Sequence, residues 1–227
     1  LVETDREFVT TQVNKESRLG NQLLYLGPHE EYTRVGSRRT FRLVVPTHAE
    51  LAVEPGAVFA SLEAASRAFD VGSRPNELLI FVVTDPVRSG GQGLSNSWWV
   101  REVARLREVW VHERSLLDTP ANPWLHEFVH INQSHRLTDE MRWFKEASAE
   151  YYAALMSFEE GRIDYETFRD VLERGTTQPA TDAVLADRST WAGNDAEYEK
   201  GALVVGAIDR ELRAASNGSA TFQDVML

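Results

Sequence analysis

The character of the sequence changes near Pro120. Before that residue, short apolar runs typical of strands alternate with polar and glycine-rich connections. After it the strand signals stop, and apolar residues recur at helical spacing. The two periods predict different structures, since a strand turns alternate residues to one face and a helix every third or fourth. The sequence therefore predicts an α+β fold, with a mixed sheet-and-helix lobe at residues 1–118 and a helical lobe at 119–227.

In the first lobe we expect strands at 21–27 and 39–46, separated by a polar turn that carries Gly36. A helix should begin at Pro55, with Val58, Leu62, Ala65 and Phe69 at helical spacing. Strands are also expected at 77–84, at 97–101 after a glycine-rich loop, and at 107–113. In the second lobe, helices are expected at 124–134, 144–160, 165–174 and 198–214.

The composition excludes several kinds of site and partner. Cysteine is absent, which rules out disulfides, thiolate metal ligands and a cysteine nucleophile, so any metal must be held by His, Asp or Glu. The net charge of -11 argues against nucleic acid or an anionic membrane surface as the main partner. No apolar run is long enough to cross a membrane.

The basic residues are almost all arginine, since Lys15, Lys145 and Lys200 are the only lysines among 24. An acidic, lysine-poor surface is typical of salt-adapted (halophilic) proteins, but a GC-rich genome explains the same bias, and both explanations stay open. The chain begins at Leu1 and ends within a pattern, so we expect it to be a piece of a longer protein, whose compartment stays open.

Two histidines, His126 and His130, lie four residues apart in the stretch NPWLHEFVHINQ. On a helix, positions four apart differ by only about 40°, so both imidazoles project from one face. Zinc accepts histidine nitrogen and carboxylate oxygen, and Glu127 beside the first histidine is placed to act as general base. The pattern predicts one zinc ion per chain. The alternative is an amphipathic helix whose histidines are merely polar.

Such a site needs a third protein ligand, and Glu146 is the favoured residue. It begins the next expected helix and can face the histidines across a short turn. Glu150 lies four residues further along the same face, where a carboxylate commonly holds a ligand imidazole by its free N–H. On spacing alone, Asp139 and Glu140 stay open as ligands, and the acidic segment could also be an ordinary solvated helix face.

Three blocks of the sequence together resemble the gluzincin peptidases of the aminopeptidase N, leukotriene hydrolase and glycyl aminopeptidase group. WLHEFVHINQ resembles their zinc helix, WFKEASAEYY the block that supplies their glutamate ligand, and AEYEKGALVVGAIDREL their Y-x-K-G-A block. The resemblance implies that His126, His130 and Glu146 bind zinc. It implies Glu127 as catalytic base and Tyr198 as the hydroxyl that stabilises the transition state. It also implies a thermolysin-like, two-lobed catalytic domain with the zinc site in the cleft.

Two departures from that family bear on function. The spacer between His130 and Glu146 is shorter than in these aminopeptidases. Their glutamate that binds the free α-amine of the substrate also has no counterpart, because no carboxylate occurs between positions 87 and 100. Gly91, Gln92 and Gly93 of the corresponding stretch are left as the expected substrate-binding residues. A buried ammonium needs a carboxylate partner to offset its desolvation, and this stretch offers none to the free α-amine of a substrate. We therefore expect cleavage of internal peptide bonds.

Other functions stay open beside that one. An acidic residue elsewhere could bind the α-amine and make the protein an aminopeptidase. The chain could also be an inactive binding module of peptidase shape, or a plain scaffold with incidental histidines that holds no metal. If the protein is a peptidase of either kind, its partner is a peptide or protein substrate. The oligomeric state stays open.

Overall fold

The computed structural model describes residues 8–11, 23–26, 28–69, 77–83, 106–120, 122–133, 141, 143–176, 182–190 and 196–226. The chain divides into two compact units, one of Leu1–Phe59 with Arg74–Ser115 and the other of Ala60–Ser73 with Leu116–Leu227. The fold is a mixed α+β one, as the sequence predicts. The assignment of 1–118 and 119–227 as lobes of one catalytic domain stays a prediction.

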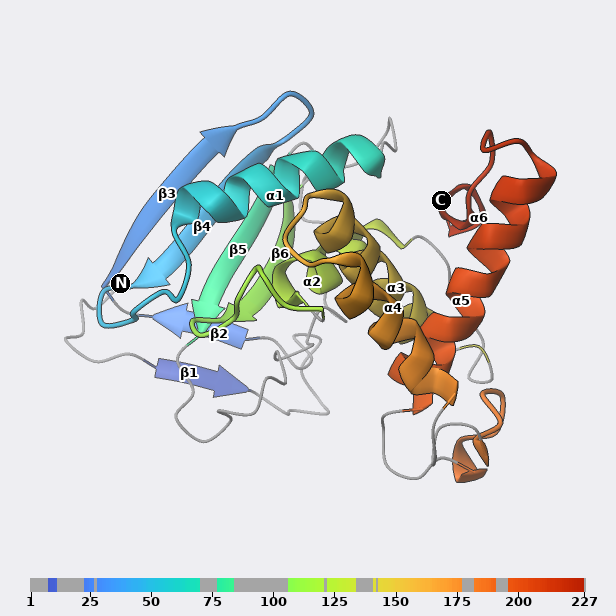
Figure 1. The fold of residues 1–227 in the computed structure, drawn as a ribbon. Coiled ribbons are helices and arrows are strands. Elements are labelled where there is room, and N and C mark those ends of the chain that lie inside the picture. Colours follow the sequence, from blue (N-terminus) through green and yellow to red (C-terminus); the bar gives the residue numbers. More distant parts are fainter. Residues whose placement is uncertain are drawn as a thin grey trace. The chain divides into compact units, whose positions relative to one another are not determined.

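The first unit contains a four-stranded sheet in the order β3 (His29–Val35), β4 (Thr40–Pro46), β5 (Glu77–Val83) and β6 (Leu106–His112), seen in Figure 1. β3 and β4 are antiparallel, whereas β4 pairs with β5 and β5 with β6 in parallel. A central parallel strand is apolar on both faces, and β5 follows this rule. Its buried residues are Leu78, Leu79, Ile80 and Val82.

The prediction of a polar turn along the whole segment between the strands expected at 21–27 and 39–46 is wrong, because the turn is shorter. Most of that connection forms the edge strand β3, and the turn is confined to the segment where the Gly36 N–H donates to the Arg39 carbonyl at 3.0 Å. Every residue of β3 is exposed, so its sequence lacks the apolar–polar alternation of a half-buried strand. β2 (Leu23–Leu26) pairs instead with β1 (Phe8–Thr11), a strand that the sequence analysis did not predict.

The helix predicted from Pro55 is confirmed as α1 (Pro55–Ala68). Proline is tolerated in a first turn because its missing N–H would have no helical partner there. The boundary between the two units falls within α1. In the first unit, Phe59 packs against Phe41 of β4 with ring centroids 6.3 Å apart. The predicted apolar positions Val58, Leu62, Ala65 and Phe69 are all buried. The glycine-rich loop and the strand expected at 97–101 lie outside the described residues.

The second unit is helical, with α2 (Pro123–Asn132), α3 (Trp143–Glu159), α4 (Tyr165–Glu173), α5 (Ala196–Ala215) and α6 (Phe222–Met226). The first four lie within two residues of the predicted helices at each end. The short helix α6 was not predicted. Phe69 packs edge-on against Phe128 of α2 and Tyr152 of α3, with ring centroids 6.2 and 5.3 Å away.

The start of α2 is fixed by the buried side chain of Asn122. Its Oδ1 accepts from the Leu125 N–H at 3.3 Å, which caps the helix. Its Nδ2 donates to the Leu117 carbonyl at 2.9 Å and to Ser157 Oγ of α3 at 3.1 Å. One amide therefore caps α2 and ties it to α3, and these two helices carry the predicted metal ligands.

Close packing also holds α5 against α3. A Cβ placed on Gly201 would lie 2.5 Å from the Cβ of Ala147, so no larger residue fits at the present helix separation. Further along, the buried carboxylate of Asp209 accepts from the Tyr151 hydroxyl at 2.8 Å and from Arg213 Nε at 2.7 Å. The contact at Gly201 places the start of α5 next to the first turns of α3, and the Tyr151–Asp209 hydrogen bond ties a later part of α5 to the middle of α3.

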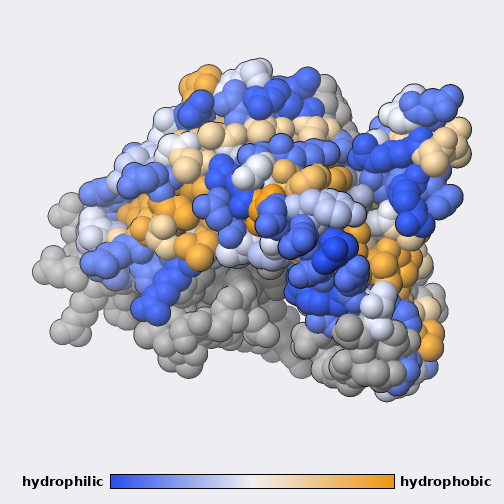
Figure 2. All heavy atoms as spheres, viewed as in Figure 1, coloured by the Kyte–Doolittle hydropathy of each residue, from blue (hydrophilic) through white to orange (hydrophobic). Residues whose placement is uncertain are grey.

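The face drawn in Figure 2 carries mainly hydrophilic residues on its described surface, with hydrophobic residues in separate patches between them. Within the described ranges, no helix has both the length and the apolar composition needed to cross a membrane.

Candidate metal centre

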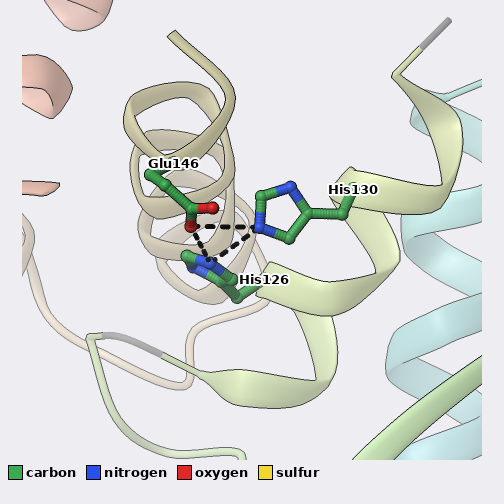
Figure 3. Close-up of side chains that lie close together, drawn as sticks. All are labelled: His126, His130 and Glu146. Carbon is green, nitrogen blue, oxygen red and sulfur yellow. Dashed lines mark hydrogen bonds and ion pairs between the residues drawn. The ribbon is translucent and has the colours of Figure 1, made fainter. Parts of the chain in front are cut away.

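Three predicted ligand side chains converge on one point of the second unit (Figure 3). His126 and His130 project from the same face of α2, and Glu146 reaches them from the first turn of α3. The two Nε2 atoms lie 3.1 Å apart. Glu146 Oε2 lies 3.3 Å from Nε2 of His126 and 3.2 Å from Nε2 of His130. The structure therefore brings these three side chains together as the sequence analysis expects.

The dimensions of this triangle fit zinc. Zinc binds histidine nitrogen and carboxylate oxygen at about 2.0–2.2 Å, so two ligands at a tetrahedral angle lie about 3.3–3.5 Å apart. The three measured edges, 3.1, 3.2 and 3.3 Å, are close to that separation. Two histidines and one glutamate also leave a fourth position for water, as in catalytic zinc sites. In the described part of the chain, no other group of three or more His, Asp or Glu side chains is arranged to hold a metal ion.

The outer nitrogen of each ring faces an oxygen acceptor. His126 Nδ1 lies 3.5 Å from Glu150 Oε2, and His130 Nδ1 lies 3.2 Å from Gln133 Oε1. A neutral imidazole carries its hydrogen on one nitrogen only, so a ring that donates from Nδ1 presents a lone pair at Nε2. Two such lone pairs and a carboxylate oxygen then face one another, and a cation between them would remove their mutual repulsion.

The electrostatics of the cluster also favour a cation. Burial lowers the pKa of His126, but its hydrogen bonds with Glu146 and Glu150 outweigh this and raise the pKa to about 10. Burial raises the pKa of Glu146, but hydrogen bonds with His126 and His130 hold it well below its ordinary value. Both directions follow from carboxylates crowded around two imidazoles in a buried site, where a proton and a metal ion compete for the same nitrogens.

Glu127 and Tyr198 lie at the same cluster. Glu127 is buried beside His126 in α2, and its charge contributes to the raised pKa of that histidine. Tyr198, from the first turn of α5, stacks on the His126 ring with centroids 6.0 Å apart and an interplanar angle of 27°. Burial, followed by the charge of Glu146, raises the pKa of Tyr198, so the phenol keeps its proton and remains a donor. The structure thus places a carboxylate and a phenol beside the ligand triangle.

The expected substrate-binding residues Gly91, Gln92 and Gly93 lie outside the described residues, as do the alternative ligands Asp139 and Glu140.

Gln133, whose side-chain oxygen faces His130, was not among the predicted site residues. The available signal was its spacing, because a residue three positions after His130 lies on the same helix face. That spacing is common by chance, so it does not predict the contact. The contact also requires one particular orientation of the Gln133 amide, which the fold imposes.

No protein-family model and no curated protein matches this sequence. Solved structures do resemble its fold. An aminopeptidase N family protein from Idiomarina loihiensis matches 89% of this chain and 40% of its own length at 18% identity, with a TM-score of 0.61. An M1 zinc metallopeptidase from Deinococcus radiodurans matches 84% of this chain and 42% of its own length at 21% identity, with a TM-score of 0.57.

A mutant of an M1 zinc metallopeptidase from Deinococcus radiodurans, bound to a Tyr-Ser-Ala substrate, matches 92% of this chain and 49% of its own length. Its identity is 20% and its TM-score 0.57. The chain therefore spans less than half the length of these structures, and at such identities the likeness is one of fold.

Proposed function

We propose that this chain is the catalytic part of a zinc metallopeptidase of the gluzincin type, with one zinc ion per chain. The observation that carries the proposal is the ligand triangle of His126, His130 and Glu146, whose edges suit tetrahedral zinc. The fold likeness to M1 metallopeptidases supports it. With it we propose the thermolysin-like arrangement, in which residues 1–118 and 119–227 form two lobes with the zinc site in the cleft.

The residues around the triangle have separate roles in peptide hydrolysis. When bound, zinc supplies Lewis-acid activation of a water molecule and of the peptide carbonyl. The Glu127 carboxylate accepts a proton from the attacking water and gives it to the amine that leaves. The Tyr198 hydroxyl donates a hydrogen bond to the carbonyl oxygen as negative charge develops there. Glu150 holds the His126 ring by its Nδ1–H.

Replacing Tyr198 by phenylalanine tests the hydroxyl separately from the ring. Phenylalanine keeps the stacking surface on His126 but cannot donate a hydrogen bond. Losing one donor to a developing oxyanion typically costs about a hundredfold in rate, so kcat should fall by about that factor. Zinc content and KM should stay near the wild-type values. A Tyr198→Phe protein with wild-type kcat would remove Tyr198 from the mechanism.

The proposed function is tested by zinc analysis of the purified protein together with a cleavage assay on matched peptides. One peptide carries an N-terminal acetyl group and its twin a free amine. We expect internal cleavage of the acetylated peptide, because no carboxylate occurs between positions 87 and 100 to bind an α-amine. A Glu127→Gln preparation made in the same way controls for contaminating peptidases.

The other outcomes of this assay identify the alternatives. Release of single residues from the free-amine peptide alone would favour an aminopeptidase, the activity class named for the Idiomarina loihiensis protein. Bound zinc without cleavage of either peptide would favour an inactive, peptidase-like binding module. A protein that binds no zinc would overturn the proposal.

A further inference from the structure

We propose that Gln133 is a positioning residue of the metal centre, which fixes the His130 ring in the tautomer that presents Nε2 to the metal ion. The metal-binding consequence rests on the proposed function. The assignment of the tautomer rests only on the hydrogen bonds described below.

The orientation of the Gln133 amide follows from its partners. Gln133 Nε2 lies 3.0 Å from the backbone carbonyl oxygen of Lys145 and 2.8 Å from Ser148 Oγ. A backbone carbonyl can only accept, so the side-chain atom that faces Lys145 must be the NH₂ group. The reversed amide would place two oxygens against each other at 3.0 Å. The carbonyl end of Gln133 therefore points toward His130.

The hydroxyl of Ser148 fits this orientation. Ser148 is fully buried, and its Oγ lies 2.6 Å from the Phe144 carbonyl oxygen and 3.2 Å from the Lys145 carbonyl oxygen. A hydroxyl has a single hydrogen, and either carbonyl can accept it. Ser148 Oγ is then an acceptor for Gln133. Both N–H groups of the Gln133 amide are used, and the amide has one satisfactory orientation.

The consequence for His130 is a fixed tautomer. Gln133 Oε1 lies 3.2 Å from His130 Nδ1 and can only accept, so Nδ1 must carry a hydrogen. In the neutral ring, Nε2 then has a lone pair, and this is the atom that faces His126 and Glu146. Without Gln133, the His130 ring would lose the acceptor that selects this tautomer.

The first two turns of α3 therefore serve the site twice. They contribute Glu146 directly, and through the Lys145 carbonyl and Ser148 they orient Gln133 and hence His130. The two histidines are oriented differently, because His126 faces the carboxylate of Glu150 and His130 a neutral amide. A neutral partner holds the ring without adding a further negative charge to a site that already contains Glu127, Glu146 and Glu150.

The test compares Gln133→Met with wild-type protein. Methionine has a similar length but neither accepts from Nδ1–H nor donates to α3. Removing such an outer partner of a ligand typically weakens metal binding about 10–100-fold, and we expect a zinc dissociation constant raised by that factor in competition with a chelator. Gln223→Met is the matched control, since Gln223 of α6 also donates its amide to a backbone carbonyl, that of Ala68. Zinc affinity should be unchanged in the control.

A second measurement reads the tautomer itself, by ¹⁵N NMR of the histidine rings with and without chelator. The His130 ring, assigned by comparison with a His130→Gln variant, should carry its hydrogen on Nδ1 in wild-type protein. In Gln133→Met it should become a mixture of tautomers once zinc is removed. Ser148→Ala, which leaves the Lys145 carbonyl to hold the amide, should give a smaller change in affinity.

Two results would overturn the inference: an Nε2–H tautomer of His130 in wild-type protein, or equal zinc affinities of the wild-type and Gln133→Met proteins. Wild-type protein that binds no zinc would instead refute the proposed function. In that case the ring spectrum in the absence of metal still decides whether Gln133 fixes His130.

Discussion

Replacing Glu127 by glutamine is expected to lower peptide turnover by about 10²–10⁴-fold, the usual contribution of a general acid–base group. Glutamine has nearly the same shape, so it fits the buried position, where the native side chain is 4% exposed. It cannot accept a proton, and the leaving amine loses its proton source with it. Because none of the three ligand atoms is changed, zinc should stay bound. The measurements are kcat on a cleaved peptide and zinc content by atomic absorption.

The combination of these two readouts is what identifies the role of Glu127. Loss of both turnover and zinc would mean that Glu127 supports the metal site or the fold instead of moving a proton. Turnover within a few fold of wild type would exclude it as the base.

The second large effect concerns the third ligand. Replacing Glu146 by alanine removes the oxygen that lies 3.2–3.3 Å from both Nε2 atoms, and two histidines alone hold zinc weakly. We expect zinc affinity to fall by more than about 100-fold, beyond what the loss of an outer partner costs, and activity to be lost at ordinary zinc concentrations. Glu150→Gln is the matched control, because it changes a carboxylate one turn along α3 that faces only the outer nitrogen of His126.

Glu150→Gln should weaken zinc binding by about 10–100-fold and keep measurable activity. If Glu146→Ala kept wild-type affinity, the third ligand would have to come from another residue, and Asp139 or Glu140 would be the next to substitute.

The elements with strong periodic patterns were predictable from sequence. α2 to α5 each carry apolar residues at helical spacing, and β5 is an apolar run after its first residue, Glu77, so pattern and structure agree. The edge strand β3 is exposed along its whole length, and among the described residues it pairs with no strand other than β4. The residues of β3 carry no apolar–polar pattern that predicts this pairing. α6 is too short for its period to be read, and its start depends on the Phe222 N–H donating to the distant Asp209.

Some contacts of the candidate site could likewise be predicted from the sequence, and others could not. The pairing of His126 with His130 follows from helix geometry, so the sequence alone predicts it. The approach of Glu146 requires the packing of α3 on α2, for which the sequence offered a resemblance and a plausible turn. The contact of Gln133 with His130 depends on the orientation of one amide, which is set by atoms of another helix. Such a contact has no sequence signature.

The contact between Gly201 and Ala147 links two positions that are far apart in sequence. Gly201 lies one turn after Tyr198 in α5, and Ala147 directly follows Glu146 in α3. A methyl group added at 201 would meet the Ala147 side chain at 2.5 Å, so α5 could admit it only by moving away and carrying Tyr198 with it. In natural variants of this protein, alanine at 201 should therefore occur together with glycine at 147. Positions 147 and 201 are expected to covary, although neither side chain belongs to the ligand triangle.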